Sequence, residues 1–190
     1  TRVGGAVMRA VDGLMAFPGT ILALALVAVL GPQLVNTIIA LAVVYTPRVA
    51  RVEHAAVVQI RNREYVQAAV GVGARDGYII ARHVLPNTLG PVLVQSTFTF
   101  SYAVIAEAGL SFLGVGIPPD IPSWGNLIAG GRDFMLVAPF ITVAPGVAIF
   151  LVVLALNLMG DGLRDLLDPR FRGRGLRAAG AAKNGAGGVA

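Results

Sequence analysis

The sequence predicts an all-α protein that crosses a membrane several times, and three observations carry this prediction. Of its 190 residues, 56% are hydrophobic and only 13% are charged, whereas a soluble domain carries about 25% charged residues. No charged residue stands between Asp12 and Arg48, and none stands between positions 136 and 159. The chain has no cysteine. This composition excludes an ordinary soluble enzyme, a disordered protein and a disulfide-stabilised scaffold.

The spacing of charges and helix breakers predicts four membrane spans. The 35 uncharged positions after Asp12 would form a single helix of about 52 Å, whereas the hydrocarbon core of a bilayer is about 30 Å thick. We therefore place a turn at residues 31–33, where Gly31 and Pro32 interrupt the apolar run. The predicted spans are 14–30, 34–52, 89–106 and 136–159.

The segments between the spans predict the orientation of the chain. Six arginines lie between positions 48 and 82, and six lysines or arginines follow position 160, whereas the outer loop at 107–135 holds only Arg132. Because cytoplasmic loops carry an excess of lysine and arginine, the 53–88 loop and both termini should be cytoplasmic. Residues 173–190 are basic and rich in glycine and alanine, which predicts a disordered tail.

The 62–87 segment reads as a short amphipathic helix, a glycine break and a second amphipathic helix ended by a proline. Tyr65, Ala68 and Ala69 fall at helical spacing. Gly73 can adopt a backbone angle that other residues avoid. A pair of helices in a cytoplasmic loop is a docking surface for a soluble partner, although an amphipathic helix lying on lipid is an alternative.

The spacing within this segment resembles the EAA loop of ABC-importer permeases. That pattern is Glu-Ala-Ala, three residues, Gly, nine residues, then an apolar residue, any residue, Leu and Pro. Here Gln67 opens the first triplet, Gly73 stands at the glycine position, and the last four positions are His83 to Pro86. Two identities differ from the pattern, because Gln67 replaces the glutamate and His83 replaces the apolar residue.

Three further segments resemble the dipeptide/oligopeptide/nickel branch of these importers, and the last two of them resemble its second permease type. They are Met8 to Pro18, Ala106 to Gly125 and Asn157 to Arg170. The resemblance covers residues 4–172 and implies a type I (MetI-like) transmembrane domain at 1–172. Such permeases usually have six membrane helices, so we expect two further helices before Thr1.

The resemblance also implies a function and a set of partners. The chain would form the translocation path for peptides or related small solutes, such as nickel complexes, in a bacterial-type plasma (inner) membrane. Its partners would be a second homologous permease, two cytoplasmic ABC ATPases that bind ATP and Mg²⁺, an extracytoplasmic solute-binding protein and membrane lipid, but no nucleic acid. The chain itself would bind no cofactor and would not be an enzyme. The residues expected to couple to the ATPases are Tyr65, Gln67, Ala68, Ala69, Gly73, Asp76, Leu85 and Pro86.

Polar residues in the third span mark a second candidate region. Gln95, Thr99 and Tyr102 recur at steps of three and four residues, so they should share an inward face. They could line the translocation path or hydrogen-bond between helices. Glu107 stands at the outer end of this span and could contact the binding protein, pair with Arg132 or face water as a helix-end carboxylate.

Other chemistries find little support in the sequence. The glycines at 71 and 73 lack the Gly-Lys-Ser/Thr of a phosphate-binding loop. His54 and His83 are 29 positions apart, without the spacing of a metal site, and no set of residues resembles a catalytic centre. The alternative function is a self-contained four-helix channel or scaffold that is not coupled to an ATPase.

Overall fold

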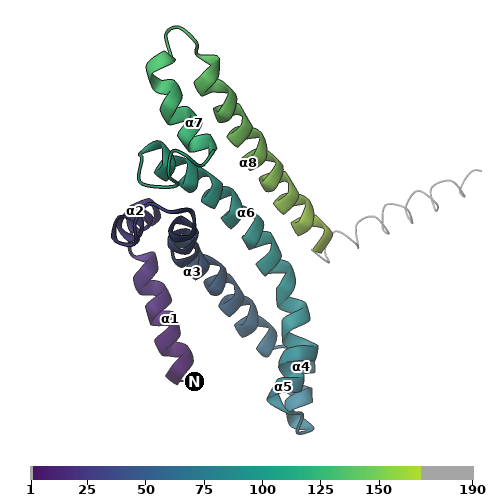
Figure 1. Cartoon of the computed structure of the whole chain (residues 1–190). Helices are drawn as coiled ribbons and strands as arrows, with labels where there is room; N and C mark the ends of the chain where they lie inside the picture. The colour runs from purple at the N-terminus through teal and green to yellow at the C-terminus, as the bar shows by residue number, and fades with distance from the viewer. Residues whose placement is uncertain (1, 168–190) are drawn as a thin grey trace, which may run out of the picture.

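The structure, a computed structural model, describes residues 2–167, and the predicted tail at 173–190 lies outside them. Within the described residues the chain forms helices and no strands (Figure 1). The helices are α1 (Arg2–Met15), α2 (Gly19–Leu30), α3 (Leu34–Arg61), α4 (Glu64–Gly71), α5 (Asp76–Ile79), the π-helix η1 (Ile80–Val84), α6 (Leu85–Phe112), α7 (Trp124–Gly131), the 3-10 helix η2 (Arg132–Phe134) and α8 (Phe140–Leu167).

Three helical runs within residues 2–167 are long and apolar enough to cross a membrane. They are α3, the continuous run Asp76–Phe112 and α8. The pair formed by α1 and α2 would give a fourth span if the two were counted together, although they meet at 93°. The predicted fold class, an all-α membrane protein with several spans, is therefore confirmed.

The first span differs from the continuous helix predicted at 14–30. Helix α1 ends at Met15 and α2 begins at Gly19. Pro18 explains the break, because proline has no backbone N–H to donate and disfavours helical geometry at the residue before it, here Phe17. The 12 residues of α2 extend about 18 Å, which is too short to cross a hydrocarbon core of about 30 Å alone.

The third span also differs from its prediction. The sequence predicted that the second loop helix ends at Pro86, before a separate span at 89–106. Instead, α5, η1 and α6 run on without interruption from Asp76 to Phe112. Proline crowds the carbonyl four residues earlier and donates no hydrogen bond. The wider π-helical turn before Pro86 accommodates both effects, and within it the Leu85 N–H bonds to the carbonyl of Ile80, five residues earlier.

Helix α6 is the centre of the packing and lies between α3 and α8 (Figure 1). Helices α4 and α5 lie at one end of the molecule and the α7–α8 hairpin at the other. One core cluster joins α2, α3 and α6. Its buried members are Ala23, Val27, Ala40, Val44, Tyr45, Ala106 and Leu110.

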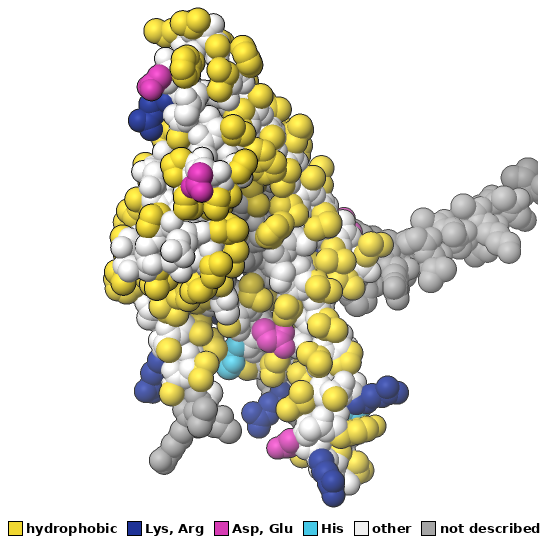
Figure 2. Space-filling model, in the orientation of Figure 1, with side chains coloured by type: hydrophobic (Ala, Val, Ile, Leu, Met, Phe, Trp, Pro, Cys, Tyr) yellow, Lys and Arg dark blue, Asp and Glu magenta, His cyan; other side chains and the backbone are white. Residues whose placement is uncertain are grey.

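A small residue lets α8 approach α6 closely. Gly160 of α8 is buried, and a Cβ added there would contact Thr97 and would lie 3.4 Å from the ring of Phe98 on α6. Outside this cluster, hydrophobic side chains cover much of the visible face (Figure 2), and many large apolar side chains are exposed. Because soluble monomers rarely expose such extensive apolar surface, this coverage fits a chain surrounded by lipid and partner helices.

Candidate functional site

The loop between α3 and α6 folds onto a small apolar cluster of its own. Ile60 comes from the last turn of α3, Val66 from α4, Ile79 from α5 and Val84 from η1, and all four side chains are buried. Val57, Ala69 and Ala74 pack against them. We call the four buried residues the loop cluster. It joins α4 and α5 to the end of α3 and to η1, which continues into α6.

The turn between α4 and α5 has the hydrogen bonds of a Schellman motif. The Ala74 N–H bonds to the carbonyl of Ala69 at 3.1 Å, and the Gly73 N–H bonds to that of Val70 at 3.0 Å. Gly73 has a φ of 78°, in the left-handed region that this motif requires of its glycine. Ala69 and Ala74 both pack on the loop cluster, so the turn is joined to it at two points.

The predicted coupling residues divide between the surface and the loop cluster. Ala69 is half-buried against the cluster. The others are exposed, with Leu85 and Pro86 at the start of α6 and the rest on α4, α5 and their turn: Tyr65, Gln67, Ala68, Gly73 and Asp76. The structure therefore brings most of them to one accessible end of the molecule.

An aromatic group and several arginines surround these residues. The ring of His83 lies between Tyr65 and Tyr78, with centroid distances of 5.9 Å and 5.7 Å. Figure 2 shows basic side chains at the end formed by α4 and α5. The exposed arginines near this end are Arg61, Arg63, Arg75 and Arg82. Sequence reasoning did not predict the aromatic group, although its three residues stand in the segment that carries the loop pattern.

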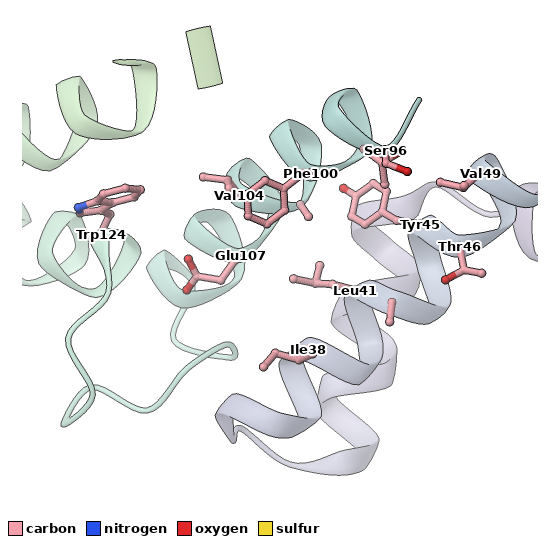
Figure 3. Close-up of a pocket in the computed structure, with 13 residues that line it drawn as sticks. Ile38, Leu41, Tyr45, Thr46, Val49, Ser96, Phe100, Val104, Glu107 and Trp124 are labelled. Atoms are coloured by element: carbon pink, nitrogen blue, oxygen red, sulfur yellow. The ribbon is translucent and has the colours of Figure 1, made fainter. Parts of the chain in front are cut away.

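The second candidate region is a hollow of about 620 Å³ between α3 and α6, with Trp124 of α7 at one end (Figure 3). We call it the α3–α6 hollow. It is lined by Ile38, Leu41, Ala42, Tyr45, Thr46, Val49, Ser96, Thr99, Phe100, Ala103, Val104, Glu107 and Trp124. Most of the lining is apolar, and Glu107 is its one charged residue.

Gln95, Thr99 and Tyr102 do not line one common hollow. Gln95 donates a hydrogen bond from Nε2 to Oγ1 of Thr99 at 3.3 Å. Thr99 lines the α3–α6 hollow, whereas Gln95 lines a second hollow beside the end of α8 and Tyr102 lines a third beside α2. The Gln95–Thr99 bond joins two residues of α6, so it does not connect helices. A bond that does connect α6 with α3 runs from the Tyr45 hydroxyl to the Tyr102 carbonyl at 3.3 Å.

Two arginines of α3 have partners that the sequence did not indicate. The guanidinium of Arg48 lies 5.1 Å from the ring centre of Tyr45 and 5.7 Å from that of Tyr102, within the range of cation–π attraction. Arg51 forms a 2.9 Å ion pair with Asp12 of α1. Tyr102 and Asp12 stand 54 and 39 positions away in the sequence, so no local pattern indicates them, whereas Tyr45 precedes Arg48 by three positions on the same helix.

Glu107 is half-buried and lies five residues before the end of α6. Its Oε1 accepts a hydrogen bond from the Ser111 hydroxyl at 2.7 Å. In the described part of the chain it forms no ion pair with Arg132, whose guanidinium instead lies 4.8 Å from the ring centre of Phe112. The pairing with Arg132 that the sequence left open is therefore wrong. The contact with a binding protein stays a prediction.

Comparison with known proteins identifies the family. Residues 1–173 match the family described as binding-protein-dependent transport system inner membrane component. The chain belongs to this family of transport permeases. The loop and the long apolar helices of this permease are thus features of an ABC-importer transmembrane component.

Three relatives illustrate the similarity. A putative peptide transport system permease protein of Brucella suis is 52% identical over 88% of this chain and 57% of its own length. The di/tripeptide transport system permease protein of Pseudomonas aeruginosa is 46% identical over 90% and 56%. The glutathione transport system permease protein of Shigella flexneri is 44% identical over 88% and 55%. The chain thus spans a little over half the length of these relatives.

Proposed function

We propose that the protein is a transmembrane permease subunit of an ABC importer for peptides or related small solutes. The observation that carries this proposal is the loop, which a buried cluster anchors to the end of α3 and to η1, and which presents exposed residues at one end of the molecule. The family match and the names of the relatives, which include peptide, di/tripeptide and glutathione permeases, support the substrate class.

The loop docks on a cytoplasmic ABC ATPase in this proposal. Tyr65, Gln67, Ala68 and Asp76 supply exposed docking contacts, whereas Ala69 and Gly73 fix the shape of the turn. ATP and Mg²⁺ bind to two ATPase subunits, and this chain binds no cofactor and catalyses no reaction. Movement of the ATPases pushes on the loop cluster and shifts α3 and α6 between two arrangements.

The remaining partners are a second homologous permease and an extracytoplasmic solute-binding protein. The solute passes between the two permeases, and the polar side chains of Gln95, Thr99 and Tyr102 serve as candidate contacts along its path. A protein with this role lies in a bacterial-type plasma membrane, with the basic loop end in the cytoplasm and both termini of this chain on the same side.

Labelling of single cysteines tests the proposed orientation. Asp76 on the loop and Asp120 after α6 are both exposed. In a cysteine-free version of the full-length protein, Asp120→Cys should react with a membrane-impermeant maleimide on intact spheroplasts. Asp76→Cys should react only after permeabilisation. Labelling of both positions from the same side would contradict the topology.

Cross-linking tests the docking of the loop. In the full-length transporter, Ala68→Cys should form a covalent adduct with the ATPase subunit when a short thiol-to-amine reagent is added. Val29→Cys provides the control, because Val29 is 86% exposed but lies on α2. An adduct at both positions, or at neither in an assembled transporter, would contradict docking through this face.

A further inference from the structure

Glu107 is a carboxylate in an apolar hollow to whose lining the described residues contribute no cation. Among the residues that line the α3–α6 hollow, the polar groups other than Glu107 are the hydroxyls of Tyr45, Thr46, Ser96 and Thr99 and the indole of Trp124. No lysine, arginine or histidine belongs to the lining. Glu107 is half-buried, and an ionisable residue within a membrane segment marks a functional site by default.

The carboxylate is held in place by groups that belong to the outer end of α6. Ser111 is 1% exposed and donates its hydroxyl to Glu107 Oε1 at 2.7 Å. The same hydroxyl accepts the backbone N–H of Ile117 at 3.1 Å, which ties it to the turn after the helix. Ser111 therefore fixes the position of one carboxylate oxygen and supplies no positive charge. The carboxylate is positioned for a cation that comes from outside the described chain.

The surroundings favour an organic ammonium as that cation. Figure 3 shows the Glu107 carboxylate at the end of the hollow where Trp124 lies, with Phe100 and Tyr45 farther along. Aromatic ring faces attract an alkylammonium group, and a carboxylate forms a short charge-assisted hydrogen bond with it. A divalent metal ion prefers several oxygen ligands and commonly more than one carboxylate, whereas this lining offers a single carboxylate.

We infer that Glu107 binds the terminal ammonium group of a peptide passing through the α3–α6 hollow. This inference rests on the proposed function of the protein as a peptide permease, and it assigns a substrate subsite within the permease itself. The hollow of about 620 Å³ is large enough for the first residues of a peptide. The apolar lining would contact their side chains without selecting among them, while the carboxylate would recognise the group that free peptides share.

Protection of a cysteine in the hollow tests the inference. In a cysteine-free full-length transporter with its partner subunits, Ser96→Cys places a thiol in the lining, and its rate of reaction with a small maleimide is measured. A peptide with a free amino terminus should slow this reaction, whereas the same peptide with an acetylated amino terminus should need at least roughly tenfold higher concentration. Glu107→Gln should remove the difference between the two peptides, and Glu107→Asp should keep part of it.

Asp120→Asn is the matched control, because it removes one negative charge from an exposed outer position. It should leave the preference for the free amino terminus unchanged. Equal protection by both peptides, or a preference that survives Glu107→Gln, would overturn the inference. ATP-driven uptake of the free peptide by the unmodified transporter is measured in parallel. Absence of uptake would instead overturn the proposed function, so the two failures are distinguishable.

Discussion

Replacing Gly73 with valine is expected to lower ATP-driven uptake at least roughly tenfold while the full-length permease still assembles in the membrane. Gly73 has a φ of 78°, and the left-handed conformation is unfavourable by about 1–2 kcal/mol for an ordinary L-residue. A β-branched side chain is disfavoured further. The strain is expected to open the Schellman turn and to change the direction in which the chain enters α5, so the loop presents a different surface to the ATPase.

Two companion variants separate backbone strain from side-chain size. Apart from the two chain neighbours, no atom of the described residues lies within 4 Å of a Cβ added at Gly73, so size alone should not disturb the loop. Gly73→Asn adds a side chain of similar size that tolerates the left-handed region, and it should retain most of the uptake. Gly71→Val adds the valine two positions earlier, where a new Cβ also meets no atom within 4 Å and φ is not positive. Equal loss in Gly73→Asn and Gly73→Val would contradict the backbone explanation.

Placing a charge in the loop cluster is expected to detach α4 and α5 from the end of α3. Val66 is 2% exposed and packs with Ile60, Ile79 and Val84. Val66→Asp removes apolar contacts and buries a carboxylate without a partner, which should destabilise the cluster by more than about 3 kcal/mol. The loop should then open, and ATP hydrolysis should no longer drive uptake.

Trypsin reports this opening without relying on transport. Arg63 and Arg75 flank α4 and are exposed, and cleavage beside them should be at least roughly tenfold faster in Val66→Asp, because proteolysis follows the open population. Val70→Asp is the control, since Val70 is 59% exposed on the same helix. Its cleavage rate should remain that of the unmodified protein. Equal cleavage of both variants would show that the cluster does not hold the loop.

The positions of the long helices could be predicted from charge spacing, because a charge inside a bilayer is unfavourable and apolar runs therefore mark the spans. The two proline effects were harder to predict. Pro18 separates α1 from α2, whereas Pro86 lies in a helix that continues past it. Whether a proline ends a helix depends on whether neighbouring turns can widen, as η1 does, and the local sequence does not determine that.

The two short helices of the loop and the glycine turn between them could be predicted from the sequence, but the loop cluster could not. Ile60 stands outside the pattern, on a helix that runs nine residues beyond its predicted end at 52. The polar face of α6 was predicted only in part. Gln95 and Thr99 are hydrogen-bonded to each other, but Gln95, Thr99 and Tyr102 line three different hollows. Helical spacing predicts which side chains of one helix point in similar directions. The hollows that these side chains line depend on how α2, α3 and α8 pack around α6.

ATP-dependent uptake of a labelled peptide is the measurement that tests the central claim most directly. The full-length permease is reconstituted in proteoliposomes with its partner permease, its ATPases and its binding protein. Uptake should require ATP together with the binding protein and should fall at least roughly tenfold when Gly73 is replaced by valine. Peptide flux through the permease alone, without ATP and unaffected by Gly73→Val, would contradict the account and would indicate a self-contained channel.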